Sequence, residues 1–222
     1  MTPVRQKRNY LFRYLLFFFG LACMALGIAL TTLANLGTTS ISALPFVASL
    51  GFRPSMGFFT GVMNLALVGL QIAVMRGKFP REQYLQIPVS LMFGPLIDFW
   101  MYLVPVPEVM SYWQSLGYLA AGTLALAFGV FVEVSADVVV MAGEGAVLVL
   151  ASFFRKDFGI VKTLFDITLV LLAVILSLSL FRELRGVREG TVISAVCVGF
   201  IVKFFFGLRN RFKKSKAGGD QE

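Results

Sequence analysis

Histidine is absent from this chain of 222 residues, and charged residues make up only 14% of it. Histidine is the side chain that most often serves as a general base or a metal ligand near neutral pH. Its absence, with no HExxH, GxSxG or nucleotide-binding motif in the sequence, excludes most ordinary catalytic sites. The two cysteines, Cys23 and Cys197, lie far apart in apolar segments and are typical of small buried hydrophobic residues. We therefore expect no enzymatic activity, no metal and no cofactor.

Hydrophobic residues, by contrast, make up 58% of the chain and include 23 phenylalanines. Apolar runs of about 20 residues, the length of helix that spans the hydrocarbon layer of a membrane, recur from end to end. This pattern predicts an all-α polytopic membrane protein with six long transmembrane helices and two short half-helices. We expect the long helices at residues 11–33, 55–75, 85–104, 113–134, 158–181 and 190–208, and the short ones at 38–50 and 143–154.

Positive charge is concentrated near both ends of the sequence. The net charge of +8 lies largely in RQKR near the start and in RNRFKKSK near the end. Basic tails that flank membrane segments are typical of cytoplasmic topology signals and of contacts with anionic lipids, more than of nucleic-acid binding. We expect cytoplasmic basic tails at residues 1–10 and 209–222 that contact anionic lipids, and no nucleic-acid partner.

The two halves of the chain resemble each other weakly but in a constant order. Each half contains a long segment, a break, a short segment and two further long segments, which predicts an internal repeat. The first repeat covers residues 11–104 and the second covers residues 113–208, with a connecting loop at 105–112. An offset of 102 residues pairs Gly20 with Gly122, Gly27 with Gly129, Asn35 with Asp137 and Asn64 with Asp166.

The topology of the short segments decides how the repeats are related. If they enter the membrane and return on the same side, each half crosses three times and the repeats are inverted; if they cross fully, the repeats are parallel. Basic residues collect in cytoplasmic loops. The three-crossing arrangement leaves Arg53 and the loop RELRGVRE outside, whereas the four-crossing arrangement leaves both RGKFPR and RELRGVRE outside. We therefore prefer inverted repeats. The three-crossing arrangement places inside Arg76, Lys78, Arg81, Arg155 and Lys156.

Polar, glycine-containing breaks precede the two short segments, at NLGTTS and at ADVVVMAGEG. Irregular backbone at membrane depth is tolerated only against protein or a water-filled cavity. The free N–H groups at the start of a short helix favour an anion, and paired half-helices are a recurring site geometry in transporters. The alternative is a pair of interfacial helices with ordinary caps. The candidate substrate-binding residues at the breaks are Asn35, Gly37, Thr38, Thr39, Ser40, Asp137, Gly143, Glu144 and Gly145.

Polar and charged side chains also interrupt the long segments. Asn64 and Asp166 occupy equivalent repeat positions, and Lys162 lies one helical turn before Asp166. A charge at the bilayer centre costs about 2.5–3.5 kcal/mol, so such residues usually face a cavity or one another. We expect Asn64, Lys162 and Asp166 to bind substrate, and Asp166 or Glu133 to exchange a proton. In the alternatives, Lys162 and Asp166 form a structural ion pair, Asn64 bonds a neighbouring helix and Glu133 lies at an aqueous rim.

Three stretches, LGTTSISALP, PVSLMFGPLID and the region from AGEG to KDFGIVKTLFD, resemble the YczE/YyaS/YitT-type group of bacterial integral membrane proteins, on its YczE-like side. The resemblance extends over residues 15–208. It implies a multi-pass protein of the bacterial inner membrane, in a group often taken to be transporters. No catalytic or substrate-binding residue is carried over from it.

The predicted function is a membrane transporter or facilitator of a small polar solute or ion, with proton coupling at an acidic residue. A channel built from two half-helices is one alternative. A non-transporting accessory or scaffold protein is the alternative of a different class. Buried acids outnumber buried lysines, which permits a cationic or zwitterionic substrate, whereas the half-helix starts favour an anion. The sequence leaves these two tendencies in conflict.

Overall fold

The computed structural model describes residues 10–107 and 109–218, with side chains up to residue 209. The predicted N-terminal tail therefore lies almost wholly outside the described residues, whereas residues 209–218 of the predicted C-terminal tail are described and helical. The described part of the chain forms eight α-helices and one short 3-10 helix, η1, without strands. The elements are α1 (Tyr10–Leu33), α2 (Ser40–Gly51), α3 (Met56–Met75), η1 (Arg81–Leu85), α4 (Gln86–Leu103), α5 (Tyr112–Ala136), α6 (Ala142–Phe154), α7 (Phe158–Phe181) and α8 (Glu189–Gly218).

Each of the eight predicted segments coincides with one α-helix. Five helices, namely α1, α3, α5, α7 and the part of α8 from Glu189 to Arg209, are long and apolar enough to cross a membrane. The protein is thus a multi-pass membrane protein by the length and composition of its helices. The sixth predicted span corresponds to α4, which has 18 residues and contains Asp98 and Pro95. It is not among the five, and the count of six spans stays a prediction.

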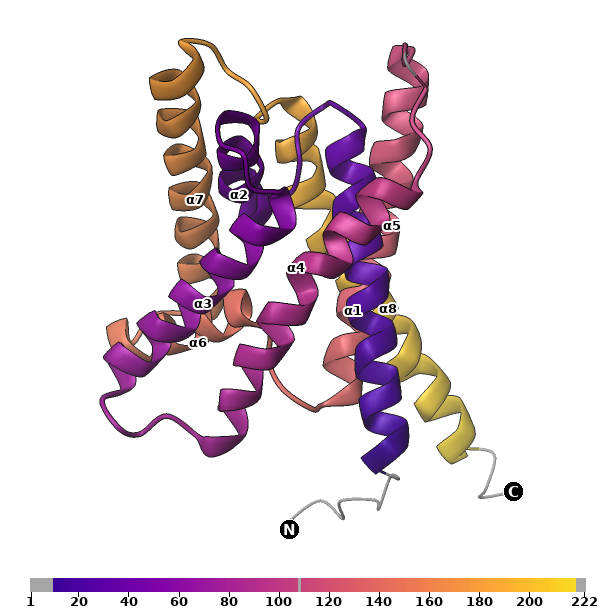
Figure 1. Ribbon diagram of the computed structural model, residues 1–222. Coiled ribbons are helices and arrows are strands. Elements are labelled where there is room, and N and C mark those ends of the chain that lie inside the picture. Colours follow the sequence, from indigo (N-terminus) through magenta and orange to yellow (C-terminus); the bar gives the residue numbers. More distant parts are fainter. Residues whose placement is uncertain (1–9, 108, 219–222) are drawn as a thin grey trace.

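The central helices α1 and α5 cross in close contact through glycines (Figure 1). A Cβ atom on Gly27 would lie 2.7 Å from the carbonyl oxygen of Gly122, and one on Gly129 would lie 2.8 Å from that of Gly20. Residue numbers rise along α1 and fall along α5 in these contacts, so the two helices are antiparallel. Only glycine permits backbones to approach this closely.

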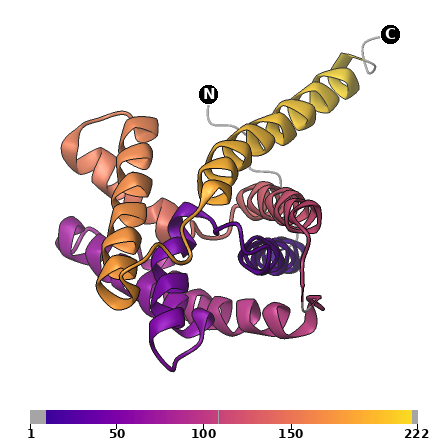
Figure 2. The same ribbon diagram turned by 90° about the horizontal axis from the view of Figure 1, so that it is seen from above.

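The other helices pack around this central pair. α4 packs against α1, and α8 packs against α5. The short helix α2 contacts α7 and α3, while the short helix α6 contacts α3 and α7. α3 also packs against α4, but the consecutive helices α7 and α8 do not form an extensively packed pair; Figure 2 shows α8 extending away from α7.

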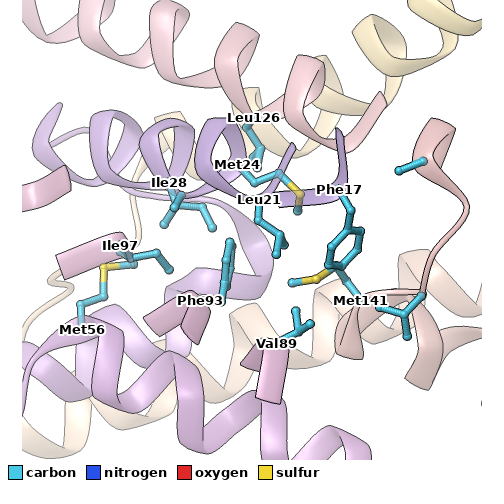
Figure 3. Packing of buried hydrophobic residues seen from close by; sticks show 13 residues of the cluster. Phe17, Leu21, Met24, Ile28, Met56, Val89, Phe93, Ile97, Leu126 and Met141 are labelled. Atoms are coloured by element: carbon cyan, nitrogen blue, oxygen red, sulfur yellow. The ribbon is translucent and has the colours of Figure 1, made fainter. Parts of the chain in front are cut away.

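The largest apolar cluster ties α1 and α4 to the starts of α3 and α6 (Figure 3). Met56 is the first residue of α3, and Met141 immediately precedes α6. Both methionines pack into the cluster, so the loop before α3 and the break before α6 are anchored against protein. Other buried members include Phe17, Leu21, Met24, Ile28, Val89, Phe93, Ile97 and Leu126.

Candidate functional site

A cavity of about 460 Å³ lies among the helices, with side chains from all eight α-helices on its wall. Its volume is in the range of small-molecule binding sites. Most of the wall is apolar, and its ionisable side chains among the described residues are Glu144, Lys162 and Asp166. The cavity is thus a mainly hydrophobic chamber with a few polar groups, as ligand pockets usually are.

The starts of the two short helices meet at this cavity. Thr39 and Ser40 at the start of α2 line it, as do Gly143 and Glu144 at the start of α6. The side chain of Ile41 lies against Gly143, where even one added carbon atom would collide with it. Residues that are about a hundred positions apart in the sequence therefore form one wall of the chamber.

The first break is held in place by the start of α8. The Thr38 amide donates to the Thr191 hydroxyl at 3.3 Å, and Ser194 donates to the Thr38 carbonyl at 3.4 Å. The Thr38 hydroxyl also pairs with that of Thr32 at 2.9 Å. Because protein groups satisfy this irregular backbone, the break is stable inside an apolar surrounding.

Asn35 and Gly37 shape this break without lining the cavity. Both have left-handed backbone conformations, with φ of 56° and 102°. The Asn35 carbonyl accepts a hydrogen bond from Arg188 at 3.0 Å, and Gly37 packs against Thr191. Their position fits a role in turning the chain from α1 into α2.

Thr39 differs from its neighbour Thr38 because its hydroxyl has no partner. It is the N-cap residue of α2, yet its side chain makes no capping hydrogen bond, and the first turn of α2 contains no acidic residue. Thr39 is 5% exposed, and its Oγ1 atom is buried without a hydrogen bond to any described group. A buried hydroxyl in this state is a polar group available to a ligand in the cavity.

The start of α6 has the opposite character, since Glu144 lies in its first turn. A carboxylate there is favoured by the partial positive charge of the helix start. Glu144 is half-buried and forms neither an ion pair nor a hydrogen bond within the described part of the chain. Glu133 on α5 lies within electrostatic range of it but is 5% exposed and does not line the cavity.

Lys162 and Asp166 lie on α7, one turn apart, and both line the cavity. The Lys162 Nζ atom donates to the Asp166 Oδ1 atom at 2.8 Å, and the side chains are 30% and 25% exposed. The two residues thus form the predicted ion pair and also face the chamber. Their opposite charges compensate, which leaves Glu144 as the unpaired charge on the cavity wall.

Asn64 lies on α3, is 4% exposed and lines the same cavity. No described residue makes a hydrogen bond with its side-chain amide. Thr60, one turn earlier, also lines the cavity, but its hydroxyl donates to the Met56 carbonyl of its own helix at 2.9 Å. Asn64 and Asp166, the aligned polar pair of the two halves, therefore share one chamber.

Four further predicted residues are outside the cavity wall. Thr38 is bonded within the first break, as described above. Asp137 is 82% exposed at its side chain and pairs with Arg13 at 2.9 Å, so it faces away from the cavity. Gly145 packs against Gln71, with a hypothetical Cβ 2.7 Å from the amide oxygen. The buried residue Glu133 is the fourth.

Several polar residues at the site were not anticipated from the sequence. Ser42, Thr163 and Ser194 line the cavity. Gln71 donates to the Ala142 carbonyl at 3.1 Å and to Gln86 at 2.9 Å, so it holds the start of α6. The presence of glutamine in an apolar segment is a signal that could have identified Gln71, whereas serines and threonines are too common in membrane helices to stand out.

The described residues contain no group of three or more His, Cys, Asp or Glu side chains that could hold a metal ion. Comparison with known proteins identifies no matching curated protein and no matching solved structure. The resemblance to the YczE/YyaS/YitT-type group stays a prediction, since no match carries that name. A family described as "Family of unknown function (DUF6198)" does match, over residues 11–207. Because the match covers nearly the whole chain, the protein belongs to this family of unknown function.

Proposed function

We propose that this protein is a membrane transporter or facilitator of a small polar solute, which binds in the cavity between the starts of α2 and α6. The observation that carries the proposal is the meeting of these two short-helix starts on one chamber, between helices that are apolar on their outer faces. Discontinuous helices whose starts meet inside the membrane are a recurring way to bind a solute in transporters. A purely structural protein has no need of such a chamber.

We further propose that the halves are inverted repeats. Support comes from the crossing of α1 and α5, which are equivalent helices of the two halves. Exchanging the halves converts the contact of Gly20 with Gly129 into a contact of Gly122 with Gly27, and both contacts are present. The packing of α2 on α7 has its counterpart in that of α6 on α3. Inverted repeats allow a carrier to open alternately to the two sides of the membrane.

The proposed orientation places both termini in the cytoplasm of a bacterial inner membrane. The loop between α3 and α4, with Arg76, Lys78 and Arg81, lies toward the same end of the molecule as the start of α1 and the end of α8 (Figure 1). The loop between α7 and α8 lies at the opposite end, where Arg185 and Arg188 pair with neighbouring glutamates. The α3–α4 loop follows the preference of basic loops for the cytoplasm, and the α7–α8 loop departs from it.

For proton coupling, Glu133 fits better than Asp166. Asp166 is held by the adjacent Lys162, whose charge compensates its own. Glu133 is buried without an ion pair to any described residue and interacts with the nearby Glu144. A buried carboxylate in these surroundings gains most from taking up a proton as the cavity changes its access.

The proposal is tested by a binding screen on the full-length protein purified in detergent. We expect at least one compound from a panel of amino acids, organic cations, organic acids and sugars to raise the melting temperature. The same compound should exchange across the membrane of proteoliposomes that contain the protein. Asp166→Asn and Glu144→Gln are expected to weaken this stabilisation, while Glu82→Gln on the exposed helix η1 leaves it unchanged. A panel with no stabilising and no exchanging compound contradicts the proposed function.

A carrier, a channel and a scaffold differ in the sides of the membrane from which a reagent can reach the cavity. In a protein carrying Cys23→Ala and Cys197→Ala, we expect Asn64→Cys to react with a membrane-impermeant thiol reagent from one side of the membrane at a time. Leu171→Cys, on the exposed outer face of α7, is the matched control and is expected to stay unmodified because it faces lipid. Simultaneous reaction of Asn64→Cys from both sides indicates a channel, and no reaction from either side indicates a scaffold.

A further inference from the structure

We infer that the solute is a small zwitterion with an apolar body, whose anionic group binds at the start of α2 and whose cationic group binds at Glu144. This inference rests on the proposed function, because it names the chemical class of the solute that the cavity takes. It follows from the different chemistry of the two helix starts that meet on the cavity wall.

The start of α2 is suited to an anionic group. Its first-turn N–H groups have no acidic side chain nearby within the helix, and its N-cap residue Thr39 makes no capping hydrogen bond. Thr39 lines the cavity wall, and its Oγ1 atom is buried without a partner among the described residues. A carboxylate placed here accepts hydrogen bonds from the hydroxyl and from the helix start together, which satisfies both.

The start of α6 is suited to a cationic group. Glu144 has no basic partner in the described part of the chain, and Lys162, the basic residue on the cavity wall, is already paired with Asp166. An anionic ligand without an ammonium group therefore meets repulsion at this end, and a cation without a carboxylate leaves Thr39 unsatisfied.

The contact between the two starts limits the spacing of the ligand charges. Ile41, the second residue of α2, packs directly against Gly143, the residue before Glu144. The two charged groups of the ligand must therefore be close together, as they are in an α-amino acid or a betaine. The conflict between acids that favour a cation and helix starts that favour an anion disappears when one molecule carries both charges.

The rest of the chamber is suited to an apolar body. Its wall beyond the two starts is formed mainly by aliphatic, methionine and phenylalanine side chains of α1, α4, α5 and α8. These make favourable contacts with a hydrocarbon side chain but form no hydrogen bonds with a sugar or a polyol. Residues of this apolar wall include Met24, Phe93, Leu126, Val130 and Val198.

A series of ligands that differ only in charge tests the inference on the full-length protein in detergent. The zwitterionic probes are L-leucine, L-phenylalanine and glycine betaine; the single-charge analogues are L-leucinamide, which lacks the carboxylate, and 4-methylpentanoate, which lacks the ammonium group. We expect at least one zwitterion to bind in calorimetry, and each single-charge analogue of L-leucine to bind at least tenfold more weakly than L-leucine.

The outcomes of this series are distinguishable from those of the broader panel. If a singly charged or neutral compound stabilises the protein while none of the three zwitterions binds, the inference is overturned and the proposed function stands. Equal binding of L-leucine and either of its analogues also overturns it. If no compound of any class binds or exchanges, both the inference and the proposed function are contradicted.

Two variants test which charged group of the ligand binds at the start of α2 and which binds at Glu144. Thr39→Val is expected to weaken binding of the zwitterion about tenfold and to have little effect on an amide analogue, because the lost hydroxyl contacts the carboxylate. Glu144→Gln is expected to weaken the zwitterion similarly and to improve binding of the anionic analogue. The assignment is contradicted if Thr39→Val and Glu144→Gln each change the binding of both analogues by the same factor.

Thr60→Val is the matched control for Thr39→Val. Thr60 lines the same cavity, but its hydroxyl is already bonded to the Met56 carbonyl, so binding is expected to change less than twofold. Thr39→Ser, which keeps the hydroxyl, is expected to retain binding. Melting temperatures without ligand show whether each variant is folded, and if Thr39→Val is not, loss of binding in Thr39→Ser overturns the α2 assignment.

Discussion

A Gly27→Ala variant is expected to lose about 3 kcal/mol of its free energy of unfolding and to be recovered largely as aggregate. The added Cβ atom would lie 2.7 Å from both the Gly122 carbonyl oxygen and the Leu126 Cα atom. These are backbone atoms of α5 and cannot turn aside as a flexible side chain would, so α1 and α5 must separate. Unfolding of the detergent-solubilised protein in a denaturing detergent, with size-exclusion chromatography, measures the loss.

Gly117→Ala on α5 is the matched control for this substitution. Among the described residues, no atom beyond its chain neighbours and the nearby backbone of its own helix lies within 4 Å of the position that its Cβ would occupy. Alanine favours a helix over glycine by about 0.5–1 kcal/mol, so this variant is expected to be as stable as the parent protein or slightly more stable. Equal stability of the two variants would mean that the α1–α5 crossing is not a close backbone contact.

A Gln71→Met variant is expected to lose about 2–4 kcal/mol of its free energy of unfolding, the second large effect. Gln71 is 2% exposed and donates to both the Gln86 amide oxygen and the Ala142 carbonyl. Methionine has a similar volume but no donor, so two buried acceptors lose a partner at about 1–2 kcal/mol each. The same unfolding titration measures the loss.

The neighbouring Gln83 offers a matched control. It accepts a hydrogen bond from Gln86 at 2.6 Å but forms none with the described residues of α6, and Gln83→Met is expected to cost less than about 1 kcal/mol. The double variant Gln71→Met, Gln86→Met is expected to be less destabilised than the sum of the single variants, because it removes one acceptor with its donor. Additive losses would contradict a network shared by the two buried side chains.

The helices themselves could be predicted from the sequence, because each is a predominantly apolar run bounded by polar residues, glycine or proline. The i, i+4 spacing of Lys162 and Asp166 also indicated an ion pair on one helix face, and the structure contains it. Local spacing along a helix determines such contacts. Helix α4, in contrast, has 18 residues but falls short of the apolar character of the five long helices.

The identity of the cavity residues within each break could not be predicted in the same way. Thr38 and Thr39 are adjacent and chemically identical, yet the Thr38 hydroxyl pairs with that of Thr32, whereas the Thr39 hydroxyl has no partner among the described residues. The Thr38 backbone is also held by Thr191 and Ser194 of α8, about 150 residues further along the chain. Asp137 was an equally polar candidate, but the left-handed turn at its backbone directs it toward Arg13.

The anchoring of the first break by α8 also bears on how the protein is made. Leu36 accepts a hydrogen bond from Gly190 at 2.8 Å, and the Thr38 amide donates to Thr191. During synthesis, the ribosome delivers the first break to the insertion machinery long before it has translated the last helix. The nascent N-terminal half therefore carries unpaired backbone groups that must stay hydrated or shielded. The chamber closes only when the final helix is inserted, which makes its completion a late step of biogenesis.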